Sequence, residues 1–269
     1  MGFIQAGVNP HPFTLNGHKL YFTNSNLMYS YGRFKLGAQA YYFPGTSRNE
    51  NSVGYFGWGT SGGTSAYPVN PWESSTTNSN YWPMILAGEM PSNADWGRNN
   101  RIYTSSGDEI FQLRTPSLAE WNDIANSSRS ISTGTKFLYC FCSIDWGAQT
   151  GGVMIFSDDY THPVGAPSIS SLNNTNYFNS NIFSVSDYEL MNAAGAVFLP
   201  NVGYIPNDGS YSVSLNDYGT TYYWSSTAYD SNTAYAEKIM VGTGFGSSQA
   251  NNINKAYGCV VRLVYDPAL

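Results

Sequence analysis

Two acidic segments of this sequence contain residues whose types and spacing are those of metal ligands. Glu120 precedes Trp121-Asn122-Asp123, and amide and carboxylate oxygens of this kind are ligands for Ca²⁺; Asp158-Asp159 is a second carboxylate pair. The first segment lies in a predicted helix, and the Pro-Asn dipeptides at 200–201 and 206–207 lack the carboxylate that would complete a site. The Asp158-Asp159 pair is explained more simply as part of a solvated turn. We therefore expect no metal and no cofactor.

The cysteines and histidines do not form a recognisable catalytic pattern. Cys140 and Cys142 are too close for an unstrained disulfide within one strand, and the odd count of 3 leaves at least one thiol unpaired. A disulfide between Cys259 and Cys140 or Cys142 is left as an alternative. The favoured interpretation is that all three cysteines are small buried residues in strands. The 3 histidines lack zinc-ligand spacing, and no nucleophile elbow or phosphate loop occurs. A non-enzymatic protein is expected.

The composition favours a loop-rich β protein and argues against nucleic-acid binding. Charged residues make up 11% of the 269 residues, whereas the chain holds 27 Gly, 13 Pro and 22 Tyr. Tyr, Ser and Asn are common in recognition surfaces, although they are equally common in loop-rich extracellular proteins. The formal net charge is -6 and no Lys/Arg run occurs, so no nucleic-acid partner is expected.

Hydrophobic runs are too short for membrane insertion. No segment approaches the roughly 18 apolar residues that span a bilayer. Residues 1–12 lack a basic stretch followed by an apolar one, which a secretion signal would need. Three explanations stay open: a trimmed chain, a cytoplasmic protein, or a virion component released by lysis.

Local patterns predict two helices among many strands. A Thr-Pro dipeptide followed by the capping-box pair Ser117 and Glu120 predicts a helix over residues 116–128, and a similar pair predicts a second helix over residues 186–195. Both are expected to pack on one sheet. Runs of aromatic and branched residues predict strands at Ala196–Leu199, Tyr222–Thr227, Ala234–Val241 and Gly258–Tyr265, separated by loops at 200–220, 228–233 and 242–256.

Six phrases in a fixed order resemble a known family. They are Phe56-Gly-Trp-Gly-Thr-Ser-Gly62, Asp95-Trp-Gly-Arg-Asn99, Leu113-Arg-Thr-Pro-Ser-Leu-Ala-Glu-Trp121, Gly195-Ala-Val-Phe-Leu-Pro200, Tyr223-Trp-Ser-Ser-Thr227 and Gly258-Cys-Val-Val-Arg-Leu-Val264. The chain resembles the major paralogous (FISUMP-type) domains of gut-bacterial surface proteins. It is also similar to variable proteins of diversity-generating retroelements, which include phage tail-fibre tips.

The resemblance implies an α+β, C-type-lectin-like fold: two helices packed on short antiparallel strands, with long ordered loops. It implies one domain over 1–269, with an N-terminal arm at 1–20 and the C-terminal strands and ligand-binding loops at 222–265. In the retroelement systems a C-terminal stretch is diversified by adenine-directed mutation. Residues that such mutation cannot produce would then belong to the fixed scaffold; they are Glu237, Lys238, Met240, Gln249 and Lys255.

The predicted ligand-binding surface lies on the loops that flank the strand 234–241. Polar loops on a rigid sheet are the usual place for recognition residues. We expect the ligand-binding residues to be Tyr229, Asp230, Ser231, Asn232, Phe245, Ser247, Asn251, Asn252 and Asn254.

The expected partner is a cell-surface protein or glycan, and the expected location is extracellular, on a cell surface or a virion. The oligomeric state is left open. The alternatives are a calcium-independent carbohydrate-binding module of a bacterial surface lipoprotein, with Tyr229 beside Tyr235 or Phe245 as its platform, and a relative of the formylglycine-generating enzymes. That enzyme activity would need a pair of active-site cysteines.

Overall fold

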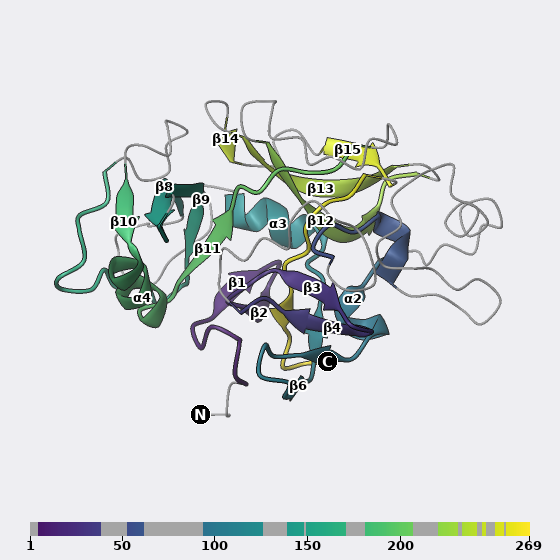
Figure 1. The fold of residues 1–269 in the computed structure, drawn as a ribbon, viewed down its shortest axis with the longest axis horizontal. Helices are drawn as coiled ribbons and strands as arrows, with labels where there is room; N and C mark the ends of the chain where they lie inside the picture. Colours follow the sequence, from purple (N-terminus) through teal and green to yellow (C-terminus); the bar gives the residue numbers. More distant parts are fainter. Residues whose placement is uncertain are drawn as a thin grey trace.

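The described part of the chain is mostly β-sheet. The computed structural model describes residues 5–38, 53–61, 94–125, 139–147, 149–170, 181–206, 220–230, 233–240, 244–245, 251–255 and 257–269. Within these ranges it has four small sheets, three α-helices and the 3-10 helix η1 (Trp58–Ser61) (Figure 1). The predicted α+β, C-type-lectin-like fold is therefore wrong. The helices have only four to nine residues, too few to form a layer of their own, and strand pairing supplies most of the framework.

The first sheet joins both ends of the chain. Its strand order is β1 (Phe13–Leu15), β2 (His18–Phe22), β16 (Val264–Tyr265) and β7 (Leu113–Arg114). The turn Asn16-Gly17 connects β1 to β2 with φ angles of 46° and 79°, which is the two-residue hairpin turn that Asn-Gly favours. Part of the region expected as an N-terminal arm, 1–20, is thus a buried strand. One domain over 1–269 stays a prediction.

Most of the second sheet is buried on both faces, apart from its edge strand at 182–184. Its order is β10 (Ile182–Ser184), β8 (Tyr139–Asp145), β9 (Gln149–Phe156) and β11 (Ala196–Pro200), with β10 and β8 parallel and the other pairs antiparallel. Alternate side chains point to two different apolar clusters. The predicted strand 196–199 is confirmed as β11.

The third sheet contains the C-terminal strands. β13 (Thr233–Met240) pairs with β12 (Thr221–Ala228) on one edge, and β14 (Gly244–Phe245) and β15 (Asn251–Asn254) pair with its other edge. The predicted strands 222–227 and 234–241 are confirmed. The prediction of a loop throughout 242–256 is wrong, because two strands form within it. Of the predicted strand 258–265 only β16 is regular, and its first residues make isolated bridges.

The fourth sheet lies below the third in the view of Figure 1. Its order is β3 (Leu27–Ser30), β4 (Arg33–Leu36), β5 (Ile102–Tyr103) and β6 (Glu109–Ile110), and only β4 and β5 are parallel. Leu36, Ile102 and Ile110 are buried in the core. The alternate residues of these strands form the outer face.

The predicted helices exist, with corrections. α3 (Leu118–Ala125) begins after Ser117, whose hydroxyl and backbone N–H exchange hydrogen bonds with Glu120 as the predicted capping box requires. Residues 126–128 lie outside the described residues. α4 (Val185–Ala193) is capped by Ser184 and Asp187, two residues before the predicted pair. α3 packs on β1, β12 and β13 whereas α4 packs on β8, β10 and β11, so the prediction that both share one sheet is wrong.

Aromatic residues of the six phrases form much of the core. Trp58, Trp96, Trp121 and Trp224 are fully buried, and α2 (Trp96–Asn99) places the second of them. The final segment runs through the centre and bonds to Phe56, Ile205 and Tyr223 on the way to β16 (Figure 1). Among the helices described, none is long and apolar enough to cross a membrane.

Candidate functional site

The turn between β12 and β13 presents an exposed tyrosine that contacts a half-buried tyrosine on β13. Tyr229 has 54% of its surface exposed, and its ring stands edge-on to that of Tyr235 at 5.2 Å between centroids. The turn is held by its own polar groups, because the Asp230 carboxylate accepts a hydrogen bond from the Thr233 N–H at 2.6 Å. The Thr233 carbonyl in turn accepts from both Tyr229 and Asp230. A surface ring on an ordered turn is suited to recognition.

A buried lysine anchors this turn to the core. Lys255 has only 2% of its surface exposed; its ammonium donates to the Asp230 carbonyl at 2.6 Å and lies 4.7 Å from the centre of the Trp58 ring. The Trp58 indole N–H donates to the carbonyl of Ser225 on β12. Burial lowers the pKa of Lys255, and the negative charge of Asp230 partly offsets that effect. The hairpin tip is therefore fixed to η1 through one cation.

The other predicted site residues divide into two groups. Asn251, Asn252 and Asn254 lie on β15 and Phe245 on β14, so they belong to strands and not to the loops that were predicted. β15 runs beside the half of β13 nearest the turn, with Asn252 opposite Tyr235, whereas Phe245 is opposite Ile239 in the other half. The side chains of Asn251, Asn252 and Phe245, and all of Ser231, Asn232 and Ser247, lie outside the described residues.

The strand register therefore brings part of the predicted surface together. Tyr229, Tyr235 and the backbone of β15 are neighbours. Four residues of β13, about 13 Å at 3.3 Å per residue, separate the position opposite Asn252 from that opposite Phe245. The suggested platform of Tyr229 with Tyr235 exists as a contact, and that of Tyr229 with Phe245 is not supported.

A second aromatic cluster was missed by sequence reasoning. Tyr204 stacks on Tyr257 at 5.5 Å and meets Tyr222 edge-on at 5.0 Å, while the Lys238 ammonium lies 5.9 Å from the Tyr222 ring centre. All four side chains are half-buried. They lie at the end of the β12–β13 hairpin away from the turn. The sequence could have indicated part of this cluster, because pairing the two predicted strands places Lys238 opposite Tyr222.

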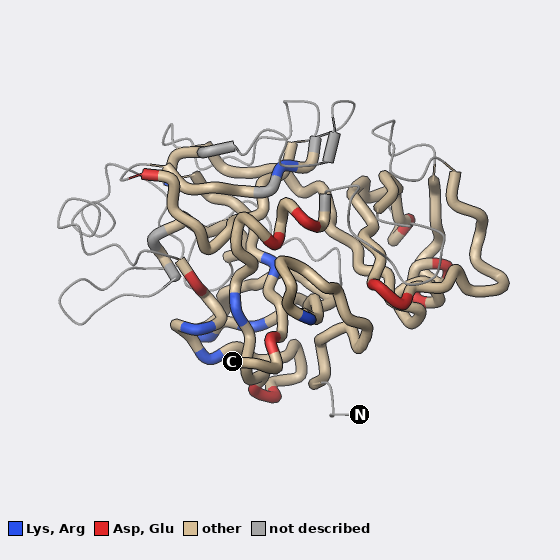
Figure 2. The backbone as a smooth tube through the Cα atoms, turned by 180° about the vertical axis from the view of Figure 1, so that it is seen from behind, with Lys and Arg blue, Asp and Glu red and all other residues tan. Residues whose placement is uncertain are grey.

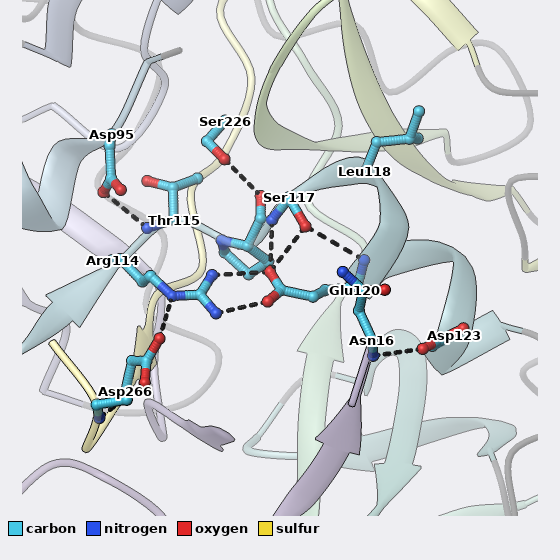
Figure 3. A network of polar contacts seen from close by, with 12 residues as sticks. Asn16, Asp95, Arg114, Thr115, Ser117, Leu118, Glu120, Asp123, Ser226 and Asp266 are labelled. Atoms are coloured by element: carbon cyan, nitrogen blue, oxygen red, sulfur yellow. Dashed lines mark hydrogen bonds and ion pairs between the residues drawn. The ribbon is translucent and has the colours of Figure 1, made fainter. Parts of the chain in front are cut away.

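The acidic segment considered as a calcium site has a structural role (Figure 3). Arg114 donates to both carboxylate oxygens of Glu120 and, through Nε, to Asp266 at 2.7 Å. The Asp123 carboxylate accepts from the backbone N–H of Asn16. Among the described residues no three His, Cys, Asp or Glu side chains gather as metal ligands. Asp158 likewise accepts from the Thr14 N–H.

The cysteines are buried thiols, as predicted; Cys140 and Cys142 lie on the strand β8, whereas Cys259 makes only an isolated bridge with Phe56. Cys140, Cys142 and Cys259 form no disulfide and are fully buried, the first two in one apolar cluster and the third in another. Burial raises the pKa of Cys142, and a hydrogen bond with Cys140 raises it further. A reactive thiolate needs the opposite shift. The arrangement does not favour the formylglycine-generating alternative.

Comparisons with known proteins give no further guide to identity. No family model matches the chain. A search of curated proteins finds no match, and a search of solved structures finds none.

The anchor leads to a first prediction. Lys255→Met keeps an apolar stem against Trp58 but removes the hydrogen bond to Asp230 and the cation–π contact, a loss of about 1–2 kcal/mol. We expect the variant to show faster amide hydrogen exchange, measured by NMR, at Tyr229 and Thr233 than the unaltered chain shows. Exchange in β8 serves as the internal reference and should change less. The exposed Lys19→Met is the control. Unchanged exchange at the turn would show that Lys255 does not hold it.

Proposed function

We propose that this chain is a non-enzymatic recognition protein that binds a cell-surface receptor through the surface around the β12–β13 turn. The observation that carries the proposal is the exposed Tyr229, in contact with the half-buried Tyr235, on a turn fixed by the buried Lys255. Binding loses less entropy when the aromatic contact residues are already ordered. The proposed setting is extracellular, on a cell surface or virion.

The composition of the neighbouring strand supports the same proposal. β15 reads Asn251-Asn-Ile-Asn254, and amides of this kind supply both donors and acceptors beside an aromatic anchor. Lys255, one of the residues that diversification could not produce, is the anchor and not part of the exposed surface. A fixed anchor beneath a replaceable surface is consistent with the sequence resemblance to variable proteins, which we retain as a proposal for the origin of this segment.

A glycan is the second candidate ligand for this surface. The edge-on contact leaves Tyr229, at 54% exposure, able to present ring surface on which a sugar can stack without calcium. Treating the target cells with protease or with periodate before binding is measured distinguishes the two, because protease removes protein receptors and periodate oxidises glycans.

The second prediction tests the surface itself. Tyr229→Ala with Tyr235→Ala is expected to weaken binding of the fluorescently labelled chain to its target cells, or to a glycan array, by about thirtyfold, the loss of a 2 kcal/mol aromatic anchor. Both residues are at least partly exposed, so the melting temperature should fall by only a few degrees.

The matched control is Phe111→Ala, which removes an aromatic ring that is 60% exposed in the segment between β6 and β7. It should leave binding unchanged. Equal binding by the double variant and the unaltered chain would remove this surface from consideration, as would equal losses in the double variant and the control.

A further inference from the structure

A groove lies on the outer face of the fourth sheet, away from the proposed receptor surface. One cavity of about 390 Å³ is lined by Ser30, Tyr31, Arg33, Lys35 and Tyr103 together with the turn 104–107. A second cavity of about 230 Å³ shares Thr104, Ser105 and Ser106 with it and continues toward Asn24 and Gly37. The larger volume lies within the range of small-molecule sites, roughly 300–1,000 Å³.

The strand register explains why polar groups converge here. Arg33 and Lys35 are two residues apart on β4, so their side chains share the face opposite to the buried Leu36. Lys35 is opposite Tyr103 on β5, and Ser30 is opposite Arg33 on β3. The Arg33 guanidinium lies 5.4 Å from the Tyr103 ring centre. Two cations, two phenols and several hydroxyls therefore face one cavity.

The charge of the groove is opposite to that of the whole chain. The formal net charge is -6, yet Arg33 and Lys35 line the cavity without a carboxylate among its lining residues. Within the described residues neither cation forms an ion pair. Figure 2 shows Lys and Arg segments gathered in the part of the molecule near the C-terminus, which also holds this sheet.

Two nearby acids are already engaged. Glu109 is opposite Tyr103 on β6, and it lies 3.7 Å from the Arg101 guanidinium. The Asp108 carboxylate accepts a hydrogen bond from Ser106 at 3.1 Å, on the turn that forms one wall of the groove. Neither carboxylate lines the larger cavity, so its excess positive charge remains available to an anion.

Tyr31 occupies a backbone position that a tyrosine rarely takes. The β3–β4 turn is Tyr31-Gly32 with φ angles of 48° and 79°, the same two-residue geometry that β1–β2 forms with Asn16-Gly17. Asn is favoured at the first position, and a bulky residue there strains the backbone. The Tyr31 side chain is 78% exposed, so burial offsets little of that strain. Tyr31, however, is one of the residues that line the groove.

We propose that this groove binds the carboxylate or sulfate group of an acidic saccharide, with Arg33 and Lys35 holding the anion and Tyr31 packing on a sugar ring. Charge-assisted hydrogen bonds from two cations suit either anion. The serine and threonine hydroxyls of the wall suit the hydroxyl groups of a saccharide, and phenol rings beside them supply stacking faces. A bare inorganic anion would use the cations but not the exposed ring.

Isothermal titration calorimetry of the full chain at low salt tests this proposal with defined probes. They are a heparin tetrasaccharide for sulfate, a hyaluronan tetrasaccharide for carboxylate, the neutral maltotetraose, and inorganic sulfate. At least one acidic tetrasaccharide should bind more tightly than maltotetraose and inorganic sulfate, with an affinity that falls as salt is added. Arg33→Gln and Lys35→Gln should each weaken it about tenfold, the value of a charged hydrogen bond.

Tyr31→Asn is the variant that best separates a loss of binding from a loss of stability. Asn suits the turn better than Tyr, so the variant should melt at the same temperature or higher while it binds the acidic tetrasaccharide several-fold more weakly. Lys19→Gln, an exposed cation on β2 outside the groove, is the charge-matched control. The Tyr229→Ala/Tyr235→Ala variant should bind the tetrasaccharide normally, which separates this site from the proposed receptor surface.

Four outcomes would overturn the proposal. Maltotetraose binding as tightly as both acidic probes would show that charge is not recognised. Inorganic sulfate binding as tightly as the tetrasaccharides would reduce the groove to a simple anion site. Equal weakening by Lys19→Gln and Arg33→Gln would show a diffuse charge effect, and absence of binding by every probe would remove the site altogether.

Discussion

Replacing Arg262 by methionine is expected to lower the free energy of unfolding by about 3–5 kcal/mol. Arg262 is fully buried, and its guanidinium donates to the Asn26 side chain at 2.8 Å, the Thr23 carbonyl at 2.8 Å and the Phe198 carbonyl at 2.9 Å. Methionine would leave these acceptors buried without their donors. Guanidinium chloride unfolding followed by tryptophan fluorescence measures the loss.

The expected size follows from the place of Arg262 in the fold. Its three acceptors belong to the segment between β2 and β3 and to β11, so one side chain links the C-terminal segment to two sheets. Burial lowers the pKa of Arg262, and the Tyr223 and Tyr188 hydroxyls partly oppose that shift. Arg262→Lys should also destabilise, because an ammonium cannot reproduce the planar fork. A loss below about 1 kcal/mol would contradict this account.

Arg114→Met is expected to cost about 3–5 kcal/mol at neutral pH, since it leaves the buried Glu120 without its cation. Burial disfavours the charged forms of this cluster, but the hydrogen bonds between Arg114 and its two carboxylates outweigh burial. They raise the pKa of Arg114 and lower the pKa values of Glu120 and Asp266. Unfolding of the unaltered chain and the variant in urea measures the difference.

The same cluster predicts a pH dependence with a defined sign. Because the folded-state pKa values of Glu120 and Asp266 lie below their ordinary values of 4.5 and 3.8, their contribution is present above those values and is lost as the pH falls through the folded-state pKa values. The difference between Arg114→Met and the unaltered chain should therefore shrink from neutral pH toward about pH 3. A difference that stays constant with pH would contradict the assignment of stability to this network. The exposed Arg101→Met is the control.

Local sequence was a good guide where the structure is decided locally. The Ser117–Glu120 capping box needs only residues three apart, and the predicted strands 196–199, 222–227 and 234–241 appear with end-points shifted by no more than one residue. The second helix was misplaced because two similar capping pairs compete: Ser186 with Glu189 and Ser184 with Asp187. The second forms because Ser184 ends β10, where its backbone is extended as a cap requires.

The candidate site was predicted in part. The sequence indicated Tyr229 and Asp230 because a polar turn separates two apolar strands, and the structure exposes the tyrosine. It gave no sign that Lys255 reaches back 25 residues to Asp230, since a lysine in a polar stretch is normally solvated. The strands β14 and β15 were missed because they are only two and four residues long, contain no run of branched or aromatic residues, and form only against the edge of β13.

The sequence by itself determined the β-rich local pattern, the short capped helices, the buried aromatic phrases and the absence of a disulfide framework, because each depends on composition or on neighbours a few residues apart. Only the tertiary structure decided which strands pair, and hence the β-rich architecture in place of the predicted C-type-lectin-like fold. It also placed Arg33, Lys35 and Tyr103 on one face, although about 70 residues separate β4 from β5. Contacts between distant segments depend on how the whole chain buries its apolar surface, which no local pattern records.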